Sequence, residues 1–205
     1  MGDDGDDLSP HFLLSPESLA GTIQTITFPY FNSIRVIIMH ENSIKLLNQA
    51  VSEEIAALHQ YMYFHFHCDD QGYDLLAGLF KRTAIEEMLH VERLAERILF
   101  LGGDVVMKAS GEVSPVQDVN EMLVMSRQME LESAQHYNQW ANECGAGADS
   151  VSKKLFEDLV VDEERHYDQY DVEMGNMKKF GINYLALQSI ERSKTRAQMP
   201  PPAGE

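Results

Sequence analysis

Apolar residues recur with a helical period along most of this chain, and the recurrence stops at a few short breaks. The pattern predicts four long helices over about Asn42–Cys68, Tyr73–Leu101, Asp118–Cys144 and Asp149–Phe180, and a shorter fifth helix over Ile182–Lys194. Glycines stand at the breaks, where the end of a helix favours a residue without a side chain. Between Ile44 and Lys194 the only proline is Pro115, which favours long helices over a β architecture.

The two ends of the chain lack this pattern. Residues 1–38 contain Ser, Thr and Pro without a sustained helical period, so we interpret them as an N-terminal extension. The helices form one domain over residues 39–195, a length that suits a single hydrophobic core. The tail 196–205 contains three consecutive prolines, and we expect it to be disordered.

The lengths of the connections predict how the helices pair. The first and third connections are short, so the first two helices form one antiparallel hairpin and the last two form another. The middle connection, Gly102–Asp118, spans 17 residues. Fully extended, it reaches ~55 Å at ~3.3 Å per residue, whereas a helix of about 28 residues is ~42 Å long. It can therefore run the length of the bundle, which predicts an all-α, ferritin-like four-helix bundle with a long crossover between helices two and three.

Composition excludes several classes of function. The formal net charge is −17, which argues against sequence-independent binding of nucleic acid. No apolar run approaches the ~20 residues of a membrane span. The acidic start, Met1-Gly-Asp-Asp-Gly-Asp-Asp, lacks the basic segment of a secretory signal, so we expect a cytoplasmic protein. The two cysteines, Cys68 and Cys144, form no CxxC motif.

Two Glu-x-x-His motifs carry the chemistry. Glu87 and His90 lie on the second predicted helix, and Glu163 and His166 lie on the fourth. Residues three apart face the same side of a helix, so each motif presents a carboxylate and an imidazole together. Two such pairs, with one glutamate from each remaining helix, are typical of di-iron carboxylate bundles. Glu54 and Glu130 are the candidates for those two lone glutamates.

The spacing of these residues supports the choice. Glu54 and Glu87 are 33 residues apart, as are Glu130 and Glu163, and the whole half-site repeats after 76 residues. A tyrosine follows each lone glutamate by seven residues, Tyr61 in one half and Tyr137 in the other. The sequence midpoint of each set of three ligands falls on a predicted turn, so all six can meet at one level. Six buried polar side chains without a metal would be costly.

Several stretches resemble the bacterioferritin branch of the ferritin superfamily. They are Glu54-Ile-Ala-Ala-Leu-His-Gln-Tyr61, Ile85-Glu-Glu-Met-Leu-His90, Glu96-Arg-Ile-Leu-Phe-Leu-Gly102, Asp162-Glu-Glu-Arg-His166 and Lys179-Phe-Gly-Ile-Asn-Tyr-Leu185. The resemblance covers roughly residues 39–195 and includes all six candidate ligands. It implies ferroxidase activity, a ferric mineral stored in a hollow shell, and in some members haem between paired subunits. The short helix after Gly181 resembles the one that closes shells of 24 subunits, with 12 as the alternative.

The resemblance also implies a haem ligand. In the Glu-Met-x-His motif the methionine, Met88 here, ligates haem b across a two-fold axis; the alternative is a methionine packed in a plain dimer interface.

We therefore expect an iron storage protein that oxidises Fe²⁺ with O₂ or H₂O₂. Glu87 and Glu163 are placed to bridge two irons, Glu54 and Glu130 to cap one each, and His90 and His166 to bind one each. Manganese suits the same ligand set. Tyr61 is expected to bond a ligand carboxylate or to supply an electron. A rubrerythrin-like peroxidase and a non-catalytic metal-binding or scaffold protein are the alternatives.

Overall fold

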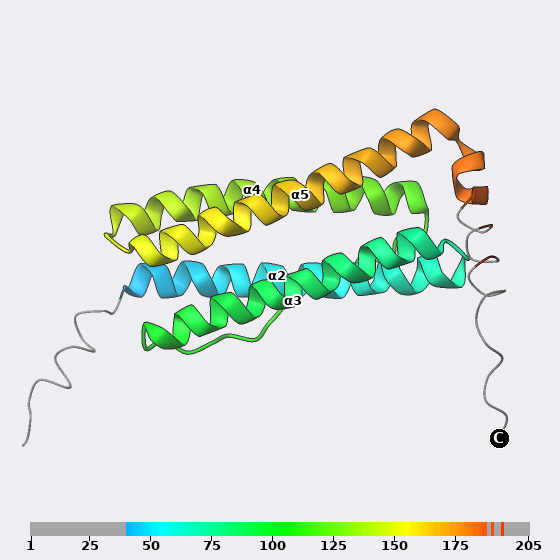
Figure 1. Ribbon diagram of the computed structural model, residues 1–205. Helices are drawn as coiled ribbons and strands as arrows, with labels where there is room; N and C mark the ends of the chain where they lie inside the picture. Colours follow the sequence, from blue (N-terminus) through cyan, green and yellow to red (C-terminus); the bar gives the residue numbers. More distant parts are fainter. Residues whose placement is uncertain (1–39, 188–189, 191–193, 195–205) are drawn as a thin grey trace, which may run out of the picture.

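The chain forms a bundle of four long helices in two antiparallel pairs (Figure 1). In this computed structural model the described residues are 40–187, with positions 190 and 194. The helices are α2 (Glu41–Asp70), α3 (Asp74–Phe100), α4 (Val119–Ala146) and α5 (Ser150–Phe180). Helix α2 packs most extensively against α3, and α4 against α5, as the short connections predict. The predicted all-α bundle is confirmed.

Local chemistry sets where the helices begin and end. The side chain of Asp118 accepts a hydrogen bond from the Glu121 amide at 3.0 Å, and Asp149 accepts one from the Ser152 amide at 3.1 Å. Each aspartate therefore satisfies an amide at a helix start that lacks an intrahelical partner. Gly102 follows α3 with a φ of 81°, a backbone conformation that glycine adopts without strain.

The crossover between α3 and α4 runs along α2. The side chain of Asn48 donates to the Asp104 carbonyl at 3.0 Å and accepts from the Val106 amide at 2.8 Å. Farther along α2, Gln60 makes the same pair of bonds with the backbone of Ser114, at 3.1 and 2.8 Å. Because the crossover traverses the bundle alongside α2, α4 starts at the end where α2 stops. Helices α2 and α4 are therefore antiparallel, and the predicted long crossover is confirmed.

The core consists of two apolar clusters with a polar layer between them. One cluster contains Leu47, Tyr137 and Phe156, and the other contains Phe64 and Phe80, all with no exposed surface. Buried carboxyl and imidazole groups lie between the clusters. The two cysteines are buried and unbridged, one in each cluster, so they lie on opposite sides of the polar layer.

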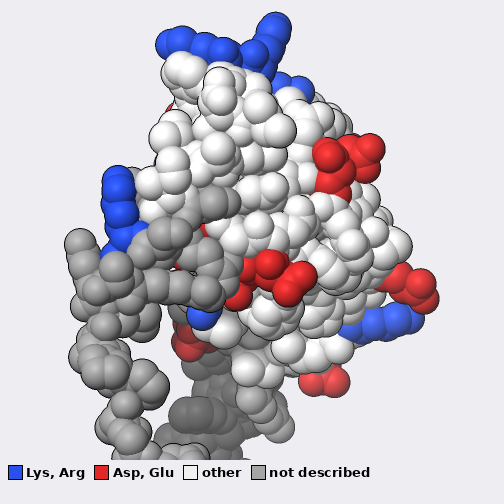
Figure 2. All heavy atoms as spheres, turned by 90° about the vertical axis from the view of Figure 1, so that its right-hand side faces the viewer, with Lys and Arg blue, Asp and Glu red and all other residues white. Residues whose placement is uncertain are grey.

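The chain turns sharply after α5. Gly181 has a φ of 57°, and residues 182–187 form the start of the predicted fifth helix. Tyr184 packs against the second apolar cluster and donates a hydrogen bond to Glu173. Figure 2 shows this end of the molecule, where most of the surface is uncharged and the basic side chains in view lie mainly at the margins.

The predicted N-terminal extension 1–38 and tail 196–205 lie outside the described residues, so the proposed domain limits stay a prediction. None of the helices within the described part of the chain is long and apolar enough to span a membrane.

Candidate metal centre

The six predicted ligands come from all four helices and meet in the polar layer. Helix α2 contributes Glu54 and α4 contributes Glu130, while α3 and α5 each contribute a glutamate and a histidine. The six residues are only 1–3% exposed. They are Glu54, Glu87, His90, Glu130, Glu163 and His166. The structure therefore brings together every residue that the spacing of the sequence selected.

These side chains form two overlapping groups. Glu54, Glu87, His90 and Glu163 offer ligand atoms that all lie within 4.8 Å of one another, and so do Glu87, Glu130, Glu163 and His166. Glu87 and Glu163 belong to both groups. A carboxylate that belongs to two adjacent groups is placed to bridge two ions, as the sequence predicts.

The same nitrogen of each imidazole faces the carboxylates. Nδ1 of His90 lies 2.9 Å from Glu87 and 3.2 Å from both Glu54 and Glu163. Nδ1 of His166 lies 3.3 Å from Glu87 and 3.8 Å from Glu163. Nδ1 is therefore the nitrogen available to a metal in both half-sites.

Several atoms at the centre fit a metal rather than a closed hydrogen-bond network. Nδ1 of His90 and of His166 and both carboxylate oxygens of Glu87 are buried without a hydrogen bond of good geometry. Buried polar atoms of this kind are rare unless water or an ion satisfies them. Four carboxyl groups and two imidazoles form a borderline-to-hard donor set that suits iron or manganese.

Two buried tyrosines tie the lone glutamates across the bundle. The Tyr61 hydroxyl on α2 donates to Oε1 of Glu130 on α4, and the Tyr137 hydroxyl on α4 donates to Oε1 of Glu54 on α2 at 2.5 Å. Each tyrosine thus orients the carboxylate of the opposite half of the repeat. The sequence left two roles open for Tyr61, a hydrogen bond to a ligand carboxylate and the supply of an electron. The bond to Glu130 is the first of these roles.

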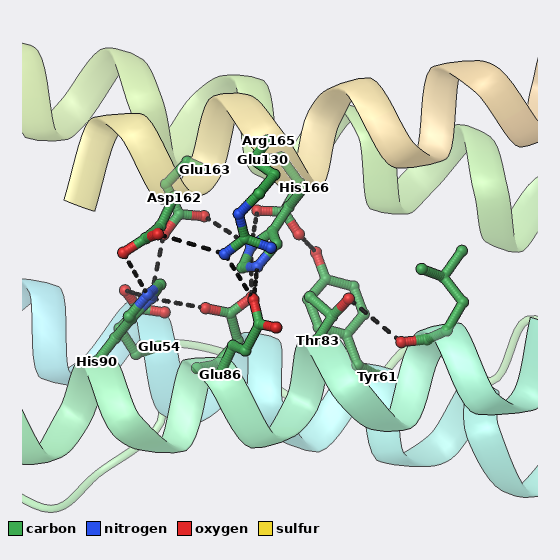
Figure 3. A network of polar contacts seen from close by, with 12 residues as sticks. Glu54, Tyr61, Thr83, Glu86, His90, Glu130, Asp162, Glu163, Arg165 and His166 are labelled. Carbon is green, nitrogen blue, oxygen red and sulfur yellow. Dashed lines mark hydrogen bonds and ion pairs between the residues drawn. The ribbon is translucent and has the colours of Figure 1, made fainter. Parts of the chain in front are cut away.

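Two further carboxylates lie next to the outer nitrogens of the histidines, and neither was predicted from the sequence. Glu86 on α3 lies 2.6 Å from Nε2 of His166 on α5, and Asp162 on α5 lies 3.4 Å from Nε2 of His90 on α3 (Figure 3). A carboxylate behind an imidazole fixes which nitrogen is protonated and orients the ring. One signal was available in the sequence, because Glu86 and Asp162 are also separated by the 76-residue repeat.

Burial and crowding shift the protonation of the site. Burial, followed by hydrogen bonding and repulsion from Glu163, raises the pKa of Glu130 to about 8. Burial and the neighbouring carboxylates raise the pKa of Glu54 well above its usual value. Burial disfavours the charged form of His90, but the three carboxylates close to its Nδ1 favour that form and raise its pKa to about 12. In the metal-free protein, protons therefore offset part of the negative charge that metal ions would offset when bound.

The comparisons with known proteins agree with this geometry. The sequence model of the family described as Ferritin-like domain matches residues 44–180 of the chain. Helix arrangement and buried ligands thus define a ferritin-like di-metal bundle.

Individual relatives narrow the assignment. A bacterioferritin of Desulfovibrio desulfuricans is 36% identical over 143 residues, which are 70% of this chain and 80% of that protein. A bacterioferritin of Brucella melitensis is 32% identical over 67% of this chain and 86% of its own length. The X-ray structure of the Desulfovibrio desulfuricans bacterioferritin, described with its di-iron site in different catalytic states, matches with a TM-score of 0.72 and 34% identity over 76% of this chain and 90% of that one. The chain belongs to the bacterioferritin family.

The raised pKa of Glu130 predicts a pH dependence of stability. Between its usual value of 4.5 and about 8, the folded protein keeps a proton here that the unfolded chain has lost. The free energy of unfolding of the metal-free protein should therefore fall as pH rises through this window, by at most about 1.4 kcal/mol per pH unit for this one group. Glu130→Gln should flatten this dependence, measured by denaturant titration after chelator treatment.

Glu132→Gln is the matched control, because Glu132 is exposed on the same helix. The assignment is wrong if Glu130→Gln and Glu132→Gln show the same slope as the unmodified protein.

Proposed function

We propose that this protein oxidises ferrous iron at a di-iron centre within each bundle and stores the ferric product. The observation that carries the proposal is the pair of buried four-ligand groups that share Glu87 and Glu163. Two adjacent ferrous ions can together supply two electrons and become ferric, which is the number needed to reduce O₂ to H₂O₂ or H₂O₂ to water. The redox chemistry belongs to the iron itself, so the protein has to supply binding, orientation and exclusion of water.

Each group of residues has a distinct task in this proposal. Glu87 and Glu163 would hold both irons, while Glu54 and Glu130 would each hold one. His90 and His166 bind through Nδ1, the nitrogen that faces the carboxylates. The tyrosine hydroxyls hold the two lone carboxylates in position, so less reorganisation accompanies the change from Fe²⁺ to Fe³⁺.

The alternatives have distinct signatures. A rubrerythrin-like peroxidase would turn over H₂O₂ without accumulating a mineral, and a silent metal-binding or scaffold protein would do neither. Among the described residues, no third group of carboxylate, imidazole or thiol side chains accompanies the two overlapping ones. Mixing the metal-free protein with ferrous salt under air separates the three, because only a storage protein combines rapid oxidation with a large bound ferric core. A cytoplasmic location stays a prediction from the sequence.

Removing a shared ligand should abolish the reaction. Glu163→Gln keeps the size of the side chain but removes a charge that both ions share, so Fe²⁺ oxidation should fall to the rate in buffer alone. Stopped-flow absorbance of the ferric product measures this rate. Glu164→Gln is the control, because Glu164 is the exposed neighbour on the same helix. Normal initial rates in Glu163→Gln would refute the site assignment.

The haem proposal rests on the position of Met88. It follows Glu87 on α3, yet its side chain is 49% exposed in the single chain, beside exposed Ile85 and Leu89. A subunit partner covering this apolar surface would bring two thioethers together, and a thioether is a soft ligand for haem iron.

Met88→Leu should therefore remove a bis-methionine haem spectrum while iron oxidation persists. Met107→Leu is the control, since Met107 is also exposed but lies in the crossover. Protein produced with ample haem that shows no Soret band would contradict haem binding.

We also propose that the chains assemble into a closed shell of 24 subunits. Beyond Gly181 the fifth helix presents Ile182, Leu187 and Ile190, which are 82%, 56% and 49% exposed in the single chain. Exposed apolar residues at this spacing offer a surface for neighbouring subunits. Light scattering on purified protein should give the mass of 24 chains, and a mass of 12 chains would refute this stoichiometry.

A further inference from the structure

A row of charged side chains covers the metal centre where α3 and α5 meet. Glu86 and Asp162 lie directly behind the two histidines, and Arg165 lies over both of them. The three side chains are 36%, 30% and 46% exposed, so they form the boundary between the buried centre and the surface. None of them is a candidate metal ligand in the two groups described above.

One guanidinium contacts both carboxylates. Nη2 of Arg165 donates to Oε2 of Glu86 at 2.7 Å and to Oδ1 of Asp162 at 3.2 Å (Figure 3). The same Oε2 of Glu86 lies 2.6 Å from Nε2 of His166. Asp162 contacts Nε2 of His90 with its other oxygen, at 3.4 Å. A continuous chain of polar contacts therefore runs from one histidine to the other through a single arginine.

The internal repeat makes this arginine stand out. Glu86 and Asp162 occupy corresponding positions 76 residues apart, and each lies close to the outer nitrogen of the histidine on the opposite helix, at 2.6 and 3.4 Å. The position that corresponds to Arg165 in the first half is Leu89, which has no charge to offer. Asp162 also contacts Arg93 on α3 at 3.2 Å, but Arg165 contacts both carboxylates and therefore links the two histidines to each other.

We propose that Arg165 is a positioning residue that couples the two halves of the metal centre. By holding Glu86 and Asp162 together, it fixes both imidazole rings with Nδ1 facing the ligand carboxylates. Both metal subsites are then preorganised as one unit. This inference rests on the proposed metal site, and it adds a residue that determines how tightly that site binds.

The direction of the effect separates positioning from simple charge. A cation close to a metal site repels metal ions, so on electrostatic grounds alone its removal should strengthen metal binding. A positioning role predicts the reverse, because loosened histidines lose the orientation that binding needs. Substitutions of groups that orient metal ligands typically weaken metal affinity by about 10- to 100-fold.

The test is a Co²⁺ titration of the full-length, metal-free protein, followed by the visible absorption bands of the bound ion. The unmodified protein should bind two Co²⁺ per chain. Arg165→Leu, which installs the residue found in the other half of the repeat, should weaken binding by at least about tenfold. Arg165→Lys should recover part of the loss, because an ammonium group can still donate to Glu86.

Two controls show whether the arginine acts through the carboxylates. Arg127 on α4 forms a different ion pair, with Asp171 on α5 at 2.6 Å. Arg127→Leu removes that pair and should leave Co²⁺ affinity unchanged. In a background that already carries Glu86→Gln and Asp162→Asn, Arg165→Leu should have little further effect. Thermal unfolding of each metal-free variant verifies that the bundle is folded.

Each contrary result overturns the proposal. Unchanged or tighter Co²⁺ binding in Arg165→Leu excludes positioning, and an equal loss in Arg127→Leu shows that the effect is not specific to Arg165. A full tenfold loss in the Glu86→Gln, Asp162→Asn background excludes action through those carboxylates. If the unmodified protein does not bind two Co²⁺, both the metal site and the coupling are refuted. If it binds two Co²⁺ and Arg165→Leu has no effect, only the coupling is refuted.

Discussion

Four carboxyl groups share one buried layer between two helix hairpins, and most features of the bundle follow from their mutual repulsion. A buried carboxylate without a partner is costly, and neighbouring carboxylates repel strongly where water is excluded. The chain reduces this cost with groups that lie in the same layer. Protonated histidines and a protonated Glu130 offset charge in the metal-free state, and the tyrosine hydroxyls satisfy Glu54 and Glu130. Apolar clusters on both sides supply the stability that the layer itself does not.

The same balance makes metal binding an exchange of charge. A divalent ion replaces protons on the imidazole and carboxyl groups, so binding releases protons and depends on pH. The outer carboxylates have lowered pKa values: burial raises the pKa of each, but hydrogen bonds from His166 and Arg165 to Glu86, and from Arg165 to Asp162, together with the nearby charge of His90, lower it further. The inner ring of groups therefore responds to the metal, while the outer ring keeps the histidines oriented in both states.

Much of the fold could be predicted from the sequence, because glycines, capping residues and connection lengths act locally. The six candidate ligands could also be selected from the sequence, since a duplicated spacing and two Glu-x-x-His motifs are difficult to obtain by chance. Glu86, Asp162 and Arg165 were not found, although the first two follow the same repeat. On a helix their residue types are ordinary for a solvated face, and only the packing of α3 against α5 turns them toward the histidines. The crossed pairing of tyrosines with glutamates depends likewise on tertiary contacts.

The crossover also has a consequence for the order in which the molecule assembles. Glu54, Glu87 and His90 all lie on the first hairpin, and Glu130, Glu163 and His166 all lie on the second. Each hairpin has contacts between residues close in sequence, and such structures form quickly. Closing the longer connection adds an entropic cost that grows only with the logarithm of its length. Docking the two hairpins is the step that brings like charges together. A cation between the hairpins offsets that repulsion, because its charge is opposite to that of the carboxylates.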